Sequence, residues 1–162
     1  MAIQVKRIVW FSLGVMVLSI VSGCATTPQR FDDKDVHFKM VSHQTISLMS
    51  GTDVYTIEVR STSPLELTHL TMYLSYPIKT STGLQGNPFL LKGSTNKQVV
   101  NLENGQSIQF TFDAPIEEVF GDTQLLDFKH PDIVLDGFTK EGSREIPFEM
   151  GGDLRIYLTQ YK

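Results

Sequence analysis

The sequence predicts an all-β domain, an antiparallel β-sandwich of about seven to eight short strands. From residue 36 onward, apolar and polar residues alternate with period two in one run after another. Clusters of Gly, Asn, Ser, Asp and Pro separate these runs, as turns do. The one stretch with helix-like signals, residues 113–121, is too short to form a packed helix. A small closed β-barrel is the alternative that the same pattern allows.

The first half of the domain contains the clearest strands. A first strand is expected from Phe38 through Ile46 to Leu48, followed by a turn at residues 50–53. The strands with the strictest alternation should direct their apolar residues into one shared core. These residues are Tyr55, Ile57 and Val59, then Leu70, Met72 and Leu74, and later Ile108, Phe110 and Phe112.

Between these strands, residues 79–88 are rich in Thr, Ser, Gly and Asn, which predicts a loop. A short apolar run at residues 89–91 follows. The residues around Val100 and Leu102 lead into Asn104-Gly105, and Asn-Gly is the strongest short signal for a hairpin.

The second half continues the pattern. Residues 115–121 suggest one or two helical turns, since a proline opens them, acidic residues follow and a glycine closes them. Strands are expected at residues 133–138 and 145–150. After a turn at residues 151–152, Leu154, Ile156 and Leu158 alternate with polar residues and predict a last strand.

This strand layout resembles that of immunoglobulin-like and fibronectin type III-like extracellular modules. The resemblance is one of pattern and not of a motif. The chain has no pair of cysteines for the disulfide of antibody domains, and its single tryptophan, Trp10, lies ahead of the domain.

The N-terminal segment has the features of an export signal. Lys6 and Arg7 precede an uncharged, largely apolar run at residues 8–21. As a helix this run would be about 21 Å long, shorter than the ~30 Å hydrocarbon core of a bilayer. We therefore expect a cleaved signal peptide rather than a stable transmembrane helix.

The end of this run is the most specific signal in the chain. Val21, Ser22 and Gly23 precede Cys24, the only cysteine. The sequence resembles the bacterial lipobox, in which an aliphatic residue and two small residues precede the cysteine. The resemblance implies that signal peptidase recognises residues 21–23, that Cys24 carries a thioether-linked diacylglycerol, and that cleavage follows Gly23. In that family the new amino terminus is often acylated as well.

The expected organisation is therefore a signal peptide at residues 1–23, a lipidated terminus and flexible tether at residues 24–35, and a sandwich domain at residues 36–162. Two or more acyl chains anchor a protein stably. The expected location is outside the cytoplasm, at the outer face of the cell membrane or at the outer membrane of a Gram-negative cell. Ala25 follows the cysteine in place of the Asp that, in the lipoprotein family, tends to retain proteins at the inner membrane.

Charge narrows the range of partners. Removing Lys6 and Arg7 with the signal leaves 12 basic against 18 acidic residues, a net charge of −6 with histidines neutral. An acidic domain repels phosphate backbones, so nucleic acid is not an expected partner. Anionic lipid is disfavoured for the same reason, which leaves anchoring to the acyl chains.

The sequence predicts neither a catalytic nor a metal site. It lacks a Gly-x-Ser-x-Gly elbow, and its cysteine is assigned to lipid. His37 with Met40, and His69 with Met72, are spaced three apart, which places each pair on opposite faces of a strand. The acidic residues around His130 lack the spacing of a calcium loop and suggest a solvated turn. No cofactor beyond the covalent lipid is expected.

The predicted function is that of a non-enzymatic binding or structural module at the cell envelope, with a protein, peptide or polymer as partner. The alternative is a membrane-held carrier of a small molecule or metal. Partner contact is expected at the loop of residues 79–88 and its flanks. Leu84 lies in that loop, and Tyr76 and Phe89 are the flanking anchors.

Overall fold

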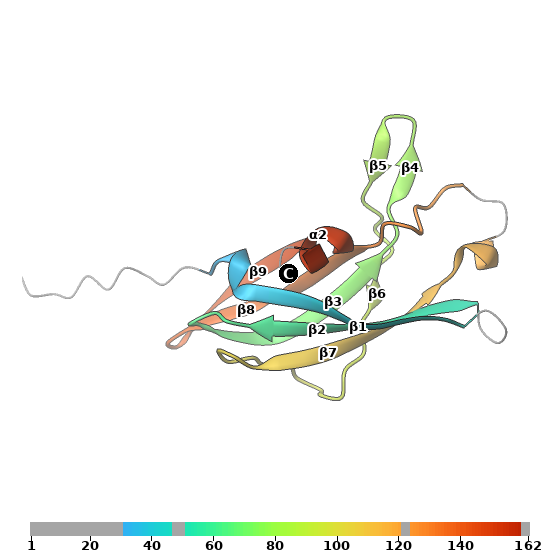
Figure 1. Ribbon diagram of the computed structural model, residues 1–162. Coiled ribbons are helices and arrows are strands. Elements are labelled where there is room, and N and C mark those ends of the chain that lie inside the picture. Colours follow the sequence, from blue (N-terminus) through green and yellow to red (C-terminus); the bar gives the residue numbers. More distant parts are fainter. Residues whose placement is uncertain (1–30, 47–50, 121–123, 160–162) are drawn as a thin grey trace, which may run out of the picture.

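The computed structural model describes residues 31–46, 51–120 and 124–159. Within them the predicted all-β sandwich is confirmed, and the sheets do not close into a barrel (Figure 1). The predicted signal peptide and lipobox, Leu48, and the first residue of the turn at 50–53 lie outside the described residues.

Two antiparallel sheets face each other. The first has the order β1-β2-β7, from the strands β1 (Val36–Ile46), β2 (Thr52–Ser61) and β7 (Ser107–Pro115). The second has the order β6-β3-β8-β9, from the strands β3 (Glu66–Ser75), β6 (Leu91–Lys92), β8 (Asp132–Glu141) and β9 (Arg144–Asp153). A separate two-stranded hairpin consists of β4 (Ile78–Thr80) and β5 (Gly83–Gln85).

The order in which the strands pair resembles that of an immunoglobulin-type sandwich. Hairpins join β1 to β2 and β8 to β9, whereas β2 pairs with β7 and β3 pairs with β8 across long stretches of sequence. In the usual lettering these are the A–B, F–G, B–E and C–F pairs, with β6 in the place of C′.

The core lies between the two sheets. All nine residues that the alternation predicted to share a core are buried, and they belong to one hydrophobic cluster. The strands β2, β7 and β8 bury every second residue over most of their length, as in β2, where Tyr55, Ile57 and Val59 face inward and their neighbours face outward. The period-two pattern was therefore a reliable guide to the inner face of each sheet.

The predicted last strand is wrong. Leu154–Thr159 forms the short helix α2, which closes the open side of the sandwich between β1 and β9 (Figure 1). Leu154 is buried, and Tyr157 and Leu158 pack against the core while Ile156 is exposed. This spacing is helical, and Asp153 caps the helix by accepting a hydrogen bond from the N–H of Arg155 at 2.9 Å.

Three further predictions need correction. The predicted loop at 79–88 contains most of the β4–β5 hairpin. The residues before Asn104-Gly105 form no strand, because Leu102 makes only an isolated bridge to Leu67 of the other sheet. The predicted helix at 115–121 is the shorter 3-10 helix η2 (Glu117–Phe120), because Pro115 still belongs to β7.

The residues immediately before position 36 also contact the sandwich. Phe31 packs against Phe148 with ring centroids 4.3 Å apart. A 3-10 helix, η1 (Asp33–Asp35), follows, and Asp32 caps it by accepting from the N–H of Lys34. The last five residues of the predicted tether therefore pack on the sandwich.

Candidate functional site

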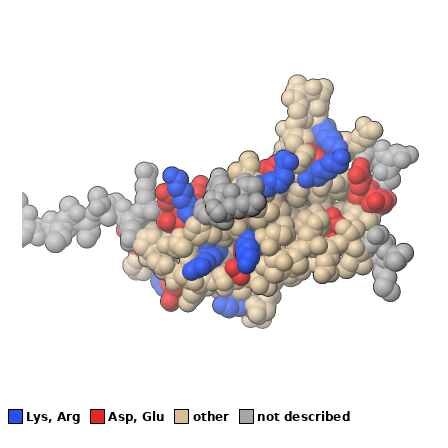
Figure 2. Space-filling view, in the orientation of Figure 1, with Lys and Arg blue, Asp and Glu red and all other residues tan. Residues whose placement is uncertain are grey.

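The β4–β5 hairpin projects from one end of the sandwich. Figure 1 shows it standing away from both sheets, at the end of the molecule opposite η1. Lys79 is its only charged residue. In Figure 2 the hairpin is accordingly mostly uncharged, whereas basic and acidic side chains are interspersed over the sandwich on the face shown.

The three predicted contact residues have different environments. Leu84 at the hairpin is 56% exposed and Phe89 is 72% exposed. Tyr76 is 4% exposed, and its ring packs on Phe128 at a centroid distance of 4.6 Å. Tyr76 thus belongs to the core and offers no surface to a partner, whereas the other two residues do.

Hydrogen bonds hold the base of the hairpin to the sandwich. The side-chain amide of Asn87 donates to the C=O of Tyr76 at 2.9 Å, and the N–H of Phe89 donates to Oδ1 of Asn87 at 2.9 Å. The N–H of Lys79 donates to the C=O of Leu125 at 2.7 Å. Four exposed apolar residues lie on the hairpin or on the segments beside it: Leu84, Phe89, Leu90 and Leu125.

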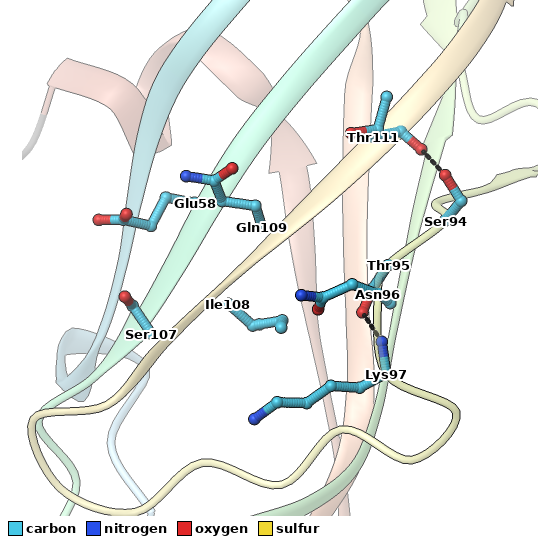
Figure 3. Close-up of a pocket in the computed structure, with 9 residues that line it drawn as sticks. All are labelled: Glu58, Ser94, Thr95, Asn96, Lys97, Ser107, Ile108, Gln109 and Thr111. Atoms are coloured by element: carbon cyan, nitrogen blue, oxygen red, sulfur yellow. Dashed lines mark hydrogen bonds between the residues drawn. The ribbon is translucent and has the colours of Figure 1, made fainter.

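A second candidate region lies beside β7, at the other edge of the first sheet. An open polar hollow of about 590 Å³ separates the outer side of β2 and β7 from the segment after β6 (Figure 3). Its lining includes Glu58, Ser94, Asn96, Lys97, Ser107 and Gln109. Sequence reasoning missed this region, because the hollow depends on how a segment of irregular structure passes a strand edge.

One backbone pairing forms the upper end of this hollow. The N–H of Ser94 donates to the C=O of Thr111 at 2.8 Å, and the N–H of Thr111 donates to the C=O of Ser94 at 2.8 Å. Figure 3 shows the hydroxyl of Ser94 also directed at Thr111, whose C=O accepts from it at 3.1 Å. The chain then bends away, with the N–H of Lys97 donating to Oγ1 of Thr95.

A polar cluster connects the end of β1 to the start of β2. Asp53 accepts from the hydroxyl of Thr45 at 2.7 Å and from that of Tyr55 at 3.2 Å, and Nε2 of His43 lies 3.3 Å from its carboxylate. The ring of His43 stacks on Tyr55. Burial, followed by interactions with Tyr76 and Asp53, raises the pKa of Tyr55. The phenol therefore stays protonated and the cluster serves to hold the two strands together.

The acidic region around His130 differs from the predicted solvated turn. Asp127 is 8% exposed, and Nδ1 of His130 lies 2.7 Å from its Oδ2. Burial alone would raise the pKa of Asp127. The hydrogen bonds from His130 and from the N–H of Lys129 outweigh burial and lower the pKa below 3.8. This carboxylate is therefore held by hydrogen bonds within the fold and is not a solvated group.

The predicted histidine–methionine pairs are also structural. Met72 is fully buried in the core, as the alternation predicted, and Met40 packs against the core. His37 lies 3.0 Å from the hydroxyl of Thr62. In residues 31–46, 51–120 and 124–159, no group of three or more His, Cys, Asp or Glu side chains is placed to hold a metal ion.

On the outer face of the second sheet, Asp136 of β8 lies directly opposite Glu149 of β9. Burial, and then the charge of Glu149, raise the pKa of Asp136. His69 lies near this pair and is the only described non-glycine residue with a positive φ, 53°, at the irregularity in the β3–β8 pairing. Histidine is among the residues that tolerate this conformation.

None of the helices in the described part of the chain has the length and hydropathy needed to span a membrane.

Comparison with known proteins adds little to this picture. No protein-family model matches the chain, and no curated protein matches it. Among solved structures, the sporulation control protein Spo0M from Bacillus subtilis is similar, with 16% sequence identity and a TM-score of 0.35. The match covers 74% of this chain and 48% of that one, so the chain spans about half the length of Spo0M. A likeness at this level supports no conclusion about what this chain does.

Proposed function

We propose that the chain is an extracytoplasmic lipoprotein, held to a bacterial membrane by acyl chains on Cys24, and that its sandwich domain binds an envelope partner without catalysing a reaction. The observation that carries the proposal is the sequence at residues 21–24, where two small residues precede the single cysteine at the end of an uncharged run. The export signal before it supports the same location.

The hairpin supports the binding role. Exposed apolar side chains at the tip and base of a projecting element are typical of contact surfaces rather than of a solvated loop. Leu84 and Phe89 are therefore the contact residues of the proposal, and a protein, peptide or polymer of the envelope is the partner class. The hairpin and η1 lie at opposite ends of the sandwich, so an anchor ahead of η1 would leave the hairpin free to meet a partner (Figure 1).

Fatty-acid labelling tests the anchor. Cells that produce the full chain are grown with a radiolabelled fatty acid, and the protein is isolated and counted. Cys24→Ser should abolish the label and leave the precursor uncleaved at Gly23, because the hydroxyl does not replace the thiolate as the nucleophile that takes up the diacylglyceryl group. Ser12→Ala, a change within the apolar run, should leave the label intact. Equal label on wild type and Cys24→Ser would refute lipidation.

The binding role has its own test. Leu84→Asp is compared with Val99→Asp, a change at an equally exposed apolar residue of a different segment. Leu84→Asp should leave the thermal midpoint unchanged and abolish cross-linking to envelope components, while Val99→Asp should alter neither. A large loss of stability in Leu84→Asp, or unchanged cross-linking, would end the assignment of this surface.

A further inference from the structure

The edge of β7 presents backbone groups that can be located from one observed pairing. Thr111 exchanges both of its backbone hydrogen bonds with Ser94, so its N–H and C=O point away from β2. Along a strand these directions alternate with period two. The N–H and C=O of Gln109 and Ser107 therefore point to the same side as those of Thr111, and away from β2.

The chain itself does not use these groups. Residues after Ser94 would have to continue along β7 to reach Gln109, but the turn at Thr95 directs them away, across the hollow. In the described residues, no backbone or side-chain group bonds to the N–H or C=O of Gln109 on this side. Ser107 and Gln109 are both exposed.

This edge also lacks the features that usually protect a strand edge. Natural edges are blocked by charged residues, proline or a bulge. Neither Ser107 nor Gln109 is charged, and the β2–β7 register runs without a shift from Thr52–Pro115 to Arg60–Ser107. The hollow beside the edge is open, and Figure 3 shows Lys97 in the segment that faces β7 across it, whereas Glu58 lies on β2, on the other side of β7.

We propose that the edge of β7 at Ser107 and Gln109 binds an extended segment of a partner polypeptide by strand addition. The segment runs antiparallel to β7 and continues the pairing that Ser94 begins, so that one residue exchanges two hydrogen bonds with Gln109 and the next but one does so with Ser107. The residue between them faces inward beside Ile108, which lines the hollow. The partner segment therefore has a small apolar residue between two polar ones.

The occupant is a peptide strand because the exposed groups of this edge are backbone donors and acceptors in strand geometry. The chain's own Ser94 already pairs with Thr111 on the same edge. This inference goes beyond the proposed function. It involves a different surface from the hairpin and depends on neither the lipid nor Leu84.

The test uses the full chain in detergent and the synthetic peptide acetyl-Lys-Thr-Val-Thr-Val-Thr-Lys-amide. Amide exchange, resolved residue by residue by NMR, is measured with and without the peptide. Without it, the amide of Gln109 should exchange fast and that of Phe110, which points to β2, slowly. Saturating peptide should slow exchange at Gln109 and Ser107 at least about tenfold.

Two pairs of controls separate backbone pairing from other contacts. N-methylation of the peptide's threonines, whose amides face β7 in the proposed register, should abolish protection, while N-methylation of its valines should not. In the protein, Gln109→Pro removes one outward N–H and should weaken binding about tenfold without unfolding an edge strand, whereas Gln109→Thr should bind as wild type does.

Three results would overturn the proposal. The first is a Gln109 amide already protected in the free chain, which would mean that residues 95–98 or a second copy cover the edge. The second is no protection on adding the peptide. The third is equal binding of the two N-methylated peptides, which needs no altered protein and so stands even if Gln109→Pro fails to fold.

Discussion

At the scale of single residues, side chains of the same type differ in burial and therefore in their contribution to stability. Phe110 is 1% exposed at the centre of the core, whereas Phe89 is 72% exposed beside the hairpin. Phe110→Ala removes a large buried ring and leaves a cavity, so it should lower the free energy of unfolding by about 3–5 kcal/mol. Phe89→Ala should change it by less than about 0.5 kcal/mol. Urea unfolding of both variants checks this, and similar losses would contradict the placement of Phe110 in the core.

A second prediction at this scale concerns Asp127. Because its pKa is lower in the folded chain than the ordinary value of 3.8, its ionised form stabilises the fold at neutral pH. That contribution is lost as the pH falls through the lowered pKa. Asp127→Asn keeps an oxygen for the N–H of Lys129 but removes the charge.

The variant should therefore be less stable than wild type at pH 7, and the difference should shrink toward pH 2. Thermal midpoints measured from pH 7 to pH 2 would show this convergence. A difference between the two proteins that stays constant with pH would mean that the carboxylate's charge is not what stabilises the native state.

The same residue shows what sequence reasoning could not reach. Asp127 lies three residues before His130, and the local sequence around the two residues predicts a solvated turn. Asp127 is buried, and its N–H donates to the C=O of Pro77, a residue far away in the chain that the local sequence does not reveal. By contrast, the burial of Met72 followed from alternation alone, since its own strand sets its direction.

At the scale of elements, period two was informative over long strands and ambiguous over short segments. In residues 154–158, the apolar residues Leu154, Ile156 and Leu158 have the spacing of a strand. Leu154, Tyr157 and Leu158 have the spacing of one face of a helix. Five residues cannot distinguish the two periods. The available signal for a helix was Asp153, whose side chain caps it. The turn predicted at residues 151–152 is wrong as well, since both glycines pair with β8 as part of β9.

The β8–β9 hairpin provides a prediction at this scale. Asp136 and Glu149 face each other across the two strands, and like charges in this position are destabilising. Since Asp136 has a raised pKa in the fold, its ionised form costs stability above that pKa. Glu149→Gln should stabilise the protein at pH 7 by a few tenths of a kcal/mol, because solvent screens both groups.

The gain should shrink toward pH 3, as the pH falls through the raised pKa of Asp136 and its carboxylate becomes neutral, and it should also shrink in 1 M salt. Denaturant unfolding at the two pH values measures it. A gain that is the same at pH 3 would show that lost charge repulsion is not its cause.

At the scale of the whole molecule, the sequence predicted the class of fold but not the pairing of its strands. Nothing in β2 indicates that its second neighbour is β7, because that pairing depends on which edges remain free once the hairpins have formed. For the same reason the open edge at Gln109 could not be predicted. It exists because the segment after β6 crosses from one sheet to the other and pairs through Ser94 alone.

The closing of the sandwich yields the last prediction. Helix α2 contacts the edge strand of each sheet, β1 and β9, and Tyr157 meets Phe38 edge-on at 5.2 Å. Leu154 is 3% exposed at the start of this helix, whereas Leu125 is 58% exposed near the hairpin. Leu154→Ala should lower the free energy of unfolding by about 2–5 kcal/mol, and the same change at Leu125 by less than about 0.5 kcal/mol.

Because α2 joins both sheets to one core, Leu154→Ala should destabilise them together. Amide exchange in β1 and in β9 should accelerate by the same factor, and urea unfolding should remain a single transition. If β9 alone lost protection while β1 kept that of the wild type, α2 would be a local cap on the β8–β9 hairpin. The two sheets would then be held together by the core side chains of β2, β3, β7 and β8 without help from the C-terminal helix.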